Sequence, residues 1–222
     1  MNAEVPAAYG RTLVVATGNA GKLREISAVL GDLGITVVPF VPEDLAETGM
    51  SFVENALIKA RHAALETDRP ALADDSGLEV DALGGAPGVY SARYAGAGAS
   101  DGDNLARLLA EMADVEDERR TARFHCVLAY LRHPQDPVPL IAHGVWEGRI
   151  LRAPCGNNGF GYDPVFYVSS HRCSSAELPP AVKNRLSHRG QALRRLCRLL
   201  DGFLKTDTLA TGINRLPGFP LV

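Results

Sequence analysis

The sequence predicts an α/β protein in which helices pack against a mixed β-sheet. Residues 12–16 form a short β-type run that leads through a glycine turn into a helix-periodic stretch at 22–30. Two longer β-type runs, 123–132 and 140–152, are separated by the prolines and polar residues of 133–137, which are typical of a turn. The first pattern indicates a strand followed by a helix and the second an antiparallel pair, so we expect a mixed sheet.

The other elements of the N-terminal half follow from the same periodicities. A β-type run at 35–40 precedes a helical pattern at 51–65. Ser51 and Glu54 have the spacing of a capping box, which marks the start of this helix. A short strand at 71–73 then ends, on this interpretation, at Asp-Asp-Ser-Gly.

The C-terminal half alternates loops, strands and helices. An extended segment at 78–80 leads into a glycine-rich stretch, 84–102, which we expect to be an ordered loop. A helix is expected at 101–112. A last helix, 178–204, contains two prolines in its first turn, where proline is tolerated.

Length and composition limit the possible functions. The 222 residues fit one domain, which we place at 11–204, between a flexible segment at 1–10 and an extension at 205–222 with no assigned role. A net charge of -3, from 23 basic and 26 acidic residues, argues against binding to a nucleic-acid polymer. The four cysteines lack metal-ligand spacing, and no apolar run is long enough for a membrane helix, so we expect a cytoplasmic protein that does not bind membranes.

The first candidate site is Thr-Gly-Asn-Ala-Gly-Lys at 17–22, between the predicted strand and helix. Backbone amides at a helix N-terminus bind phosphate, glycines permit close approach, and Lys22 adds a positive charge. The segment lacks the full phosphate-loop pattern, because Leu23 stands where a serine or threonine would bind magnesium. A simple tight turn is an equally good interpretation of these residues alone.

The second candidate is the pair Asp74 and Asp75 with Ser76 and Gly77, at the expected end of a strand. Two adjacent carboxylates require a cation if both are buried, which points to a divalent metal or to acid-base chemistry. An ordinary turn capped by an aspartate side chain explains the same residues. Acidic residues before the helix at 51–65 are candidates for a further metal ligand, although surface acids are common on loops.

Two further candidates lie near the C-terminus. In the stretch 158–164, Phe160 stands between glycines, so its ring is able to stack on a planar ligand; a structural corner is the alternative. The last helix carries several basic residues, and Arg185 and Arg189 are one turn apart, which predicts a shared face. A solvated basic face is the simpler interpretation of this helix.

Taken together, the motifs resemble the inosine triphosphate pyrophosphatase family, which is also called the dITP/XTP pyrophosphatase family. The resemblance covers about residues 12 to 203 and depends on five segments in the same order. These segments are Ala-Thr-Gly-Asn-Ala-Gly-Lys at 16–22, Ser-Phe-Val-Glu-Asn-Ala at 51–56, Ala-Asp-Asp-Ser-Gly at 73–77 with Leu-Gly-Gly-Ala-Pro-Gly at 83–88, Phe-Gly-Tyr-Asp at 160–163, and Ser-His-Arg at 187–189.

The resemblance implies an elongated mixed sheet flanked by helices, with two lobes, a central nucleotide cleft and a homodimer. It implies hydrolysis of non-standard purine nucleoside triphosphates (ITP, dITP and XTP) to the monophosphate and pyrophosphate, which cleanses the nucleotide pool. It also implies a Mg2+ cofactor. Asp75 is implied as the catalytic base and a metal ligand, with Asp74 as the alternative group that orients the water.

The remaining roles carried by the resemblance are contacts to the substrate. They fall on Thr17, Gly18, Asn19, Ala20, Gly21, Lys22, Ser76, Phe160, Gly161, Tyr162, Asp163, Lys183, His188 and Arg189. Members of the family often carry two adjacent acids before Thr-Gly, whereas Ala46 precedes Glu47 here. Glu47 is therefore the expected second metal ligand, on weaker grounds than Asp75.

Two alternatives to this function stay open. One is a nucleotide pyrophosphatase that acts on modified pyrimidine or standard nucleoside triphosphates. The other is a nucleotide-binding module without catalysis, which the pair Asp74 and Asp75 argues against. A panel of nucleotides, assayed for released pyrophosphate, separates all three.

Overall fold

The computed structural model describes residues 12–32, 34–42 and 45–210, with the backbone alone for the last ten of these. The expected N-terminal segment 1–10 and the end of the expected extension 205–222 lie outside this part of the chain. Within it, α5 continues the chain past residue 205 as far as Ala210.

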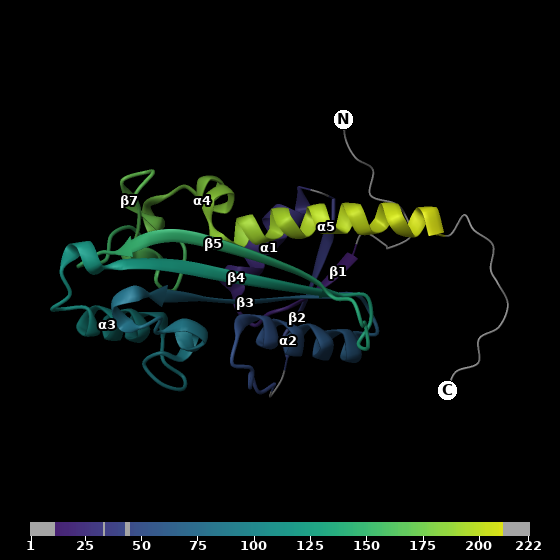
Figure 1. Ribbon diagram of the computed structural model, residues 1–222, viewed down its shortest axis with the longest axis horizontal. Coiled ribbons are helices and arrows are strands. Elements are labelled where there is room, and N and C mark those ends of the chain that lie inside the picture. The colour runs from purple at the N-terminus through teal and green to yellow at the C-terminus, as the bar shows by residue number, and fades with distance from the viewer. Residues whose placement is uncertain (1–11, 33, 43–44, 211–222) are drawn as a thin grey trace.

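A seven-stranded mixed sheet runs along the long axis of the molecule (Figure 1). The strands lie in the order β2-β1-β3-β4-β5-β6-β7; the first three are parallel, and every pair from β3 onward is antiparallel. This confirms the predicted mixed sheet. The strands are β1 (Thr12–Ala16), β2 (Thr36–Phe40), β3 (Ala71–Val80), β4 (Thr121–Leu131), β5 (Leu140–Ile150), β6 (Phe166–Val168) and β7 (Cys173–Ser174).

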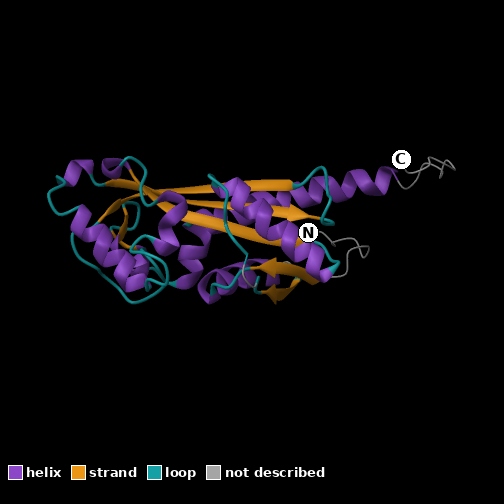
Figure 2. Ribbon diagram, turned by 90° about the horizontal axis from the view of Figure 1, so that it is seen from below, coloured by secondary structure: helices purple, strands orange, loops and turns teal. Residues whose placement is uncertain are grey.

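Helices cover both faces of the sheet (Figure 2). On one face α1 packs beside α5, over a core that includes Leu72, Leu128 and Leu193. On the other face α2 packs on β1, β3 and β4 through a row of small residues such as Ala60 and Ala64. The helices are α1 (Ala20–Gly31), α2 (Phe52–Thr67), α3 (Asp101–Glu111), α4 (Pro180–Leu186) and α5 (His188–Ala210).

A second core lies at the other end of the long strands, near α3, α4 and β7 (Figure 1). It contains Trp146 and Phe166 from the sheet and Leu108 from α3. Short 3₁₀ helices connect the elements here, so part of the expected loop 84–102 is helical. They are η1 (Asp81–Leu83), η2 (Gly88–Arg93), η3 (Asp117–Arg119), η4 (Asp163–Val165) and η5 (Ser175–Glu177).

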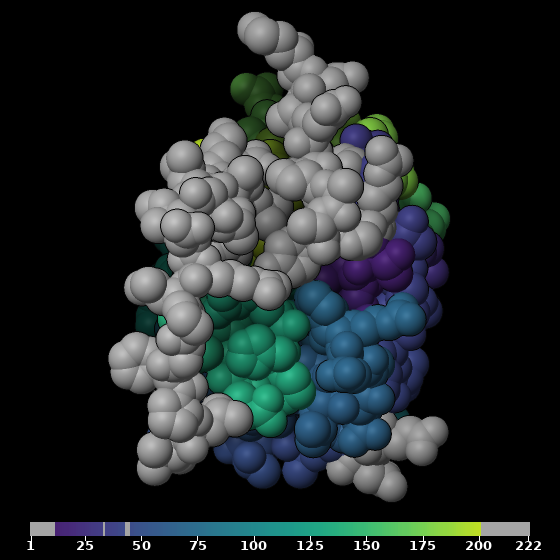
Figure 3. Space-filling view, turned by 90° about the vertical axis from the view of Figure 1, so that its right-hand side faces the viewer, coloured from purple at the N-terminus to yellow at the C-terminus, as the bar shows by residue number. Residues whose placement is uncertain are grey.

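The two ends of the sheet differ in what they carry. At the end shown in Figure 3, teal-green residues of the β4–β5 connection lie beside blue residues from the end of α2 and the start of β3.

In the described part of the chain, no helix is both long and apolar enough to cross a membrane.

Two expectations about elements are wrong. Asp-Asp-Ser-Gly does not end a strand, because β3 continues from Ala71 to Val80 and pairs with β4 over its whole length. The last helix is divided at Ser187, whose backbone is extended and whose hydroxyl accepts a hydrogen bond from Gly190 N at 3.2 Å. Ser187 therefore separates α4 from α5 and caps the first turn of α5.

Candidate functional site

The glycine loop follows β1 at the point where the order of the parallel strands reverses. From β1 the chain passes through α1 to β2 on one side, and from β2 through α2 to β3 on the other. Crevices at the carboxyl ends of such strands are the usual ligand sites of α/β sheets. The pairing of β1 with β3 stops at Ala16 and Ala73, so Asp74 and Asp75 lie just beyond the end of β1.

The loop itself is held by short polar contacts. Thr17 is buried, and its Oγ1 accepts a hydrogen bond from Asn19 N at 3.1 Å. Asn19 caps α1, and its Oδ1 accepts from Lys22 N at 3.0 Å. Gly18, Asn19 and Ala20 are exposed at the N-terminus of a helix of 12 residues. This geometry suits an anion, as the sequence predicted.

Asp74 and Asp75 point to opposite faces of β3, because successive side chains alternate along a strand. Asp74 lies on the face of α1 and α5, and Asp75 on the face of α2, where each meets a basic side chain of those helices. Both carboxylates are buried, with 1% and 6% of the residue exposed. The pair therefore contributes to two ion-pair groups, and does not form one shared metal site.

Asp74 is surrounded by four hydrogen-bond donors. Its Oδ1 lies 2.5 Å from Lys22 Nζ and accepts from Ser76 Oγ at 3.1 Å. Its Oδ2 accepts from Arg189 Nε at 2.9 Å and from Cys126 Sγ at 3.1 Å. Burial acts to raise the pKa of Asp74, but Arg189 and Lys22 outweigh it and hold the pKa well below the usual range. Asp74 is therefore a fixed anion, unsuited to accept a proton from water.

Asp75 has a different environment. Lys59 Nζ of α2 donates to its Oδ1 at 2.6 Å and lies 3.1 Å from Glu47 Oε1. Arg93 of η2 approaches the other oxygen of Glu47 at 3.6 Å. Burial raises the pKa of Asp75, and the positive charges of Lys59 and Lys22 offset only part of this effect. Asp75 is thus the better proton acceptor of the two aspartates.

The ion-pair group of Asp74 extends to Glu25 of α1, Lys183 of α4 and Asp163 of η4. Lys183 Nζ contacts Asp163 Oδ2 at 2.5 Å and Glu25 Oε1 at 2.8 Å. Arg189 NH1 binds the other oxygen of Glu25, and its NH2 donates to Ser76 Oγ at 2.9 Å. Burial acts to raise the pKa of Glu25, but Arg189 and Lys183 outweigh it and lower the pKa. Glu25 therefore fixes the ends of two predicted substrate ligands.

The aromatic loop packs against the glycine loop. A Cβ atom added to Gly21 would lie 2.4 Å from the Phe160 ring, so only glycine fits there without a shift. Lys183 Nζ and the Arg189 guanidinium carbon lie 5.0 Å and 5.7 Å from the centre of the Phe160 ring. Gly161 N donates to Asp101 Oδ2 at 2.8 Å, which connects this loop to α3. With Asp74, which contacts both Lys22 and Arg189, the structure thus brings four of the five predicted segments together.

Two predicted substrate ligands face the core. Tyr162 is buried in the core at the α3 end of the sheet, and its hydroxyl donates to Ser91 O at 2.9 Å. The His188 ring stacks on Phe124, with 4.7 Å between ring centres and 12° between planes. Burial, followed by the charge of Arg189, lowers the pKa of His188 well below its usual range, so the ring is neutral. Both side chains therefore support the site from the core.

The break at Ser187 also changes the predicted basic face. Arg185 lies in α4 and Arg189 in α5, so the expected i,i+4 relationship within one helix is wrong. Arg189 is 1% exposed and points into the ion-pair group, whereas Arg185 is exposed and its carbonyl accepts from Arg194. Only Arg189 belongs to the site.

Sequence reasoning missed four side chains of the site: Lys59, Glu25, Arg93 and Cys126. Lys59 and Glu25 occupy helical positions that ordinarily face solvent, and their partners lie far along the chain. Glu25 stands three residues after Lys22, so one turn of α1 carries both; this spacing was the available signal. Cys126 lies opposite Ser76 in the β3–β4 pair, which the sequence did not specify.

The charges of the site balance without a ligand. Three cations of the α1 and α5 face, Lys22, Lys183 and Arg189, meet three carboxylates, Asp74, Glu25 and Asp163. On the α2 face, Lys59 and Arg93 meet Asp75 and Glu47. A polyanion entering this neutral site would bring uncompensated negative charge. A bound divalent cation would compensate it.

The donor set fits such a cation. Asp75 and Glu47 direct oxygens at one point, which Lys59 Nζ now contacts, and carboxylate oxygens are the ligands that Mg2+ prefers. Within the described residues no three acidic, histidine or cysteine side chains are grouped so as to hold a metal. Mg2+ is commonly held by one or two carboxylates with phosphate oxygens and water, and these two residues suit that mode.

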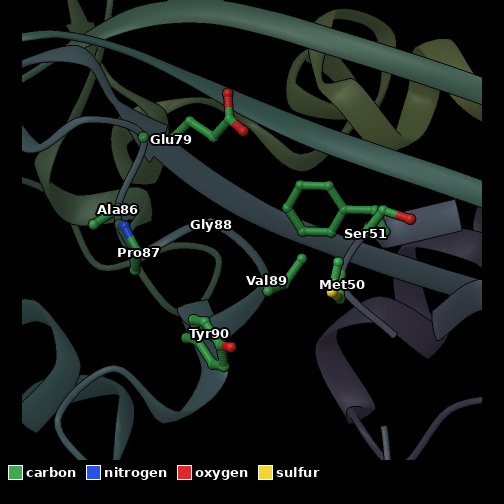
Figure 4. Close-up of a pocket in the computed structure, with 10 residues that line it drawn as sticks. Met50, Ser51, Glu79, Ala86, Pro87, Gly88, Val89 and Tyr90 are labelled. Atoms are coloured by element: carbon green, nitrogen blue, oxygen red, sulfur yellow. The ribbon is translucent and has the colours of Figure 1, made fainter. Parts of the chain in front are cut away.

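A surface groove of about 430 Å³ lies beside the Asp75 side of the sheet. In Figure 4, Met50 and Ser51 lie across the groove from the loop that carries Pro87 and Tyr90. Met50 is 88% exposed and Tyr90 60% exposed. The groove is therefore rimmed by large apolar side chains, and it is separate from the ion-pair groups.

The fold and the site together define an α/β protein whose glycine loop and two buried ion-pair groups meet at the end of β1, where the order of the parallel strands reverses. This arrangement is typical of enzymes that bind nucleotides. The chain belongs to the Ham1 family, whose sequence model matches residues 13–199.

Relatives of known name cover most of the chain. A protein of Vibrio cholerae named dITP/XTP pyrophosphatase is 58% identical over 194 residues, which are 86% of this chain and 97% of that protein. One of Escherichia coli O157:H7 with the same name is 56% identical over 83% of this chain and 95% of its own length. The solved structure of a HAM1 protein from Coxiella burnetii has a TM-score of 0.78 and 53% identity, covering 86% of this chain and 98% of that one.

Proposed function

We propose that this protein is a nucleoside triphosphate pyrophosphatase that hydrolyses ITP, dITP and XTP to the monophosphate and pyrophosphate, and so removes non-standard purines from the nucleotide pool. The relatives named dITP/XTP pyrophosphatase support this proposal over nearly their full length. The structural observation that carries it is the convergence of Asp75 and Glu47 on Lys59, next to the end of the β1 glycine loop.

Asp75 is proposed as the catalytic base. A water molecule attacks the α-phosphorus, the bond from that phosphorus to the bridging oxygen breaks, and pyrophosphate leaves with the bridging oxygen. The water proton passes to the Asp75 carboxylate. The raised pKa of Asp75 suits this role, whereas Asp74 is held ionised by its partners.

The triphosphate is proposed to lie on the glycine loop. Gly18 and Ala20 are exposed, and their backbone amides and the Lys22 ammonium are proposed to face the phosphate oxygens. Asp75 and Glu47, which Lys59 contacts, are the residues that would hold Mg2+, and the metal would neutralise phosphate charge.

The base is proposed to lie against Phe160, close to Lys183 and Arg189. Hypoxanthine and xanthine present an oxygen at position 6, which accepts a hydrogen bond from these cations, whereas adenine presents an amino group there. A buried donor left without an acceptor costs affinity, which rejects adenine. Tyr162 and His188 support the loop and α5 from the core.

The test is a panel of ITP, dITP, XTP, ATP, GTP and modified pyrimidine triphosphates at equal concentration, with and without Mg2+. Released pyrophosphate is measured separately from phosphate. We expect pyrophosphate from ITP, dITP and XTP in the presence of Mg2+. Preferred turnover of pyrimidine or standard nucleotides would establish the other enzyme, and binding without turnover would establish the binding module.

We further propose that the protein forms a homodimer, as the resemblance implied, and that it is cytoplasmic, as its composition predicted. The exposed Met50 and Tyr90 at the groove of Figure 4 support that face as the contact between two copies, because exposed apolar patches mark interaction sites. Light scattering on the purified chain and on a Met50→Asp variant tests this. We expect a dimer that the substitution converts to a monomer; a monomeric parent chain would contradict the proposal.

A further inference from the structure

The thiol of Cys126 lies inside the candidate site. The Cys126 side chain is completely buried in β4, and its Sγ is 3.1 Å from Asp74 Oδ2. Cys126 pairs directly with Ser76 across the β3–β4 ladder, so both side chains are on the α1 and α5 face of the sheet. Each donates to a different oxygen of Asp74. The two together hold the carboxylate from the strand side.

The other two donors to Asp74 come from the helices. Lys22 lies in the first turn of α1 and Arg189 in α5, and each contacts one oxygen of the carboxylate. The rotation of the carboxylate about its own axis therefore sets the position of both cations. Without the thiol, Oδ2 would be held by Arg189 alone among these four donors, and the carboxylate would follow the guanidinium.

The thiol is suited to donate and not to react. Burial, followed by the negative charge of Asp74, raises the pKa of Cys126 well above its usual value, so the sulfur keeps its proton. A protonated thiol beside a carboxylate is a weak donor to a charged acceptor. Cys126 belongs to the same apolar core cluster as Leu72, Leu128 and Ala192 and is fully buried, which shields its contact with Asp74 from bulk solvent.

We propose that Cys126 is a positioning residue for the reaction: its S–H group fixes Asp74, and through Asp74 it aligns Lys22 with the phosphates and Arg189 with the base. This inference rests on the proposed function for its reaction. The contact between thiol and carboxylate does not depend on that function, so the two are tested separately.

The first measurement is the infrared S–H stretching band. The spectrum of the parent chain minus that of Cys126→Ser isolates the band of Cys126, and the same subtraction with Cys155→Ser gives an exposed thiol of the same chain for reference. A hydrogen bond to a carboxylate weakens the S–H bond, so we expect the Cys126 band at lower wavenumber. A band at equal or higher wavenumber would show that the thiol does not donate, and would overturn the proposal.

The second measurement is kcat/KM, taken on the best substrate of the nucleotide panel. We expect Cys126→Ala to lower kcat/KM about fivefold, as loss of one hydrogen bond predicts, and Cys126→Ser to stay within about twofold of the parent chain. A role in packing alone predicts the reverse order, because serine buries a polar hydroxyl where alanine does not. Alanine activity equal to that of the parent chain would contradict the positioning role.

Thermal unfolding of both variants accompanies the kinetics, so that a loss of folded protein is not counted as a loss of turnover. If the parent chain prefers another nucleotide over ITP, dITP and XTP, the proposed function fails while the order of the two variants still decides the role of Cys126.

Discussion

Asp74 and Asp75 are neighbours in the chain, yet their carboxylates lie on opposite faces of β3 and bind different cations. Asp74 binds Lys22 and Arg189, whereas Asp75 binds Lys59 at 2.6 Å. The division gives the two groups opposite pKa shifts, with Asp74 held ionised and Asp75 closer to a proton acceptor. The two adjacent aspartates thus differ in role: Asp74 is a fixed anion, and Asp75 is the proposed base.

The first prediction concerns the base. Asp75→Asn keeps the size of the side chain but removes the group that accepts the water proton, so we expect pyrophosphate release to fall at least about a hundredfold. The circular dichroism spectrum should stay that of a folded protein. Glu79→Gln is the matched control, since Glu79 lies on the same strand and face and contacts His125 and Arg123 at the surface. Near-normal turnover in the Asp75 variant would remove it from the mechanism.

The second prediction concerns Lys59. Lys59→Met leaves Asp75 and Glu47 without their shared cation, and breaking a buried ion pair in this way costs about 3 kcal/mol. We expect a lower free energy of unfolding in chelator. Mg2+ should recover part of it, with a larger gain than in the parent chain, because the metal binds the same two carboxylates.

Denaturant titrations with and without Mg2+ measure both effects. Arg61→Met is the control, because Arg61 is exposed on the same helix. Equal Mg2+ stabilisation of Lys59→Met and the parent chain would argue against a metal at Asp75 and Glu47.

Elements with strong local signals were predictable from the sequence. β1 spans the predicted 12–16, and Ser51 caps α2 by accepting from Glu54 N at 3.3 Å. Glu54 departs from the expected box, because its Oε2 accepts from Met50 N at 2.9 Å and from Ser51 Oγ at 2.8 Å. Periodicity and caps are properties of a few neighbouring residues, so the chain itself contains them.

The interior of β3 was not predictable in this way. Asp-Ser-Gly is ordinary turn chemistry, and burial of Asp74 and Asp75 inside a strand is favourable only because cations from three helices reach them. Lys59 is 16 residues from Asp75 in the chain, and Arg189 is 115 residues from Asp74. Pairings at such separations depend on topology, which local patterns do not contain.

The division of the last helix had a local signal that apolar periodicity outweighed. Ser187 is a common type of capping residue, and it begins α5 by accepting from Gly190 N. The sequence predicts one helix because apolar residues recur at helical spacing on both sides of this serine. The break turns His188 into the core and Arg189 into the site.

The third prediction concerns pH and His188. Its pKa in the folded protein lies well below 6.5, so below that pH the unfolded chain binds a proton that the folded protein does not. Stability from this group is complete above pH 6.5 and falls as pH decreases. Between pH 6.5 and 5.5 we expect a loss of about 1 kcal/mol in the parent chain.

His188→Phe removes this titration and keeps a ring against Phe124, so we expect that part of the pH dependence to disappear. Among the described residues, His188 Nδ1 is buried without a hydrogen-bond partner, so the apolar ring should also raise stability at pH 7. His171→Gln, an exposed histidine, is the control. Unchanged pH dependence in His188→Phe would contradict the buried neutral ring, and loss of nucleotide turnover without loss of stability would support direct contact with substrate.

The fourth prediction concerns Glu25, which holds Lys183 Nζ at 2.8 Å and also binds Arg189. Glu25→Gln preserves shape but removes the charge that fixes both cations beside Phe160. The freed donors are able to turn toward other acceptors, so the site should reject adenine less well. We expect the ratio of kcat/KM for ITP to that for ATP to fall about tenfold, because discrimination by a buried donor requires that the donor be fixed.

Asp32→Asn at the end of the same helix is the matched control, since its side chain is exposed. A ratio equal to that of the parent chain would show that Lys183 and Arg189 select the base without Glu25, whereas equal losses for both nucleotides would assign Glu25 to the stability of the site.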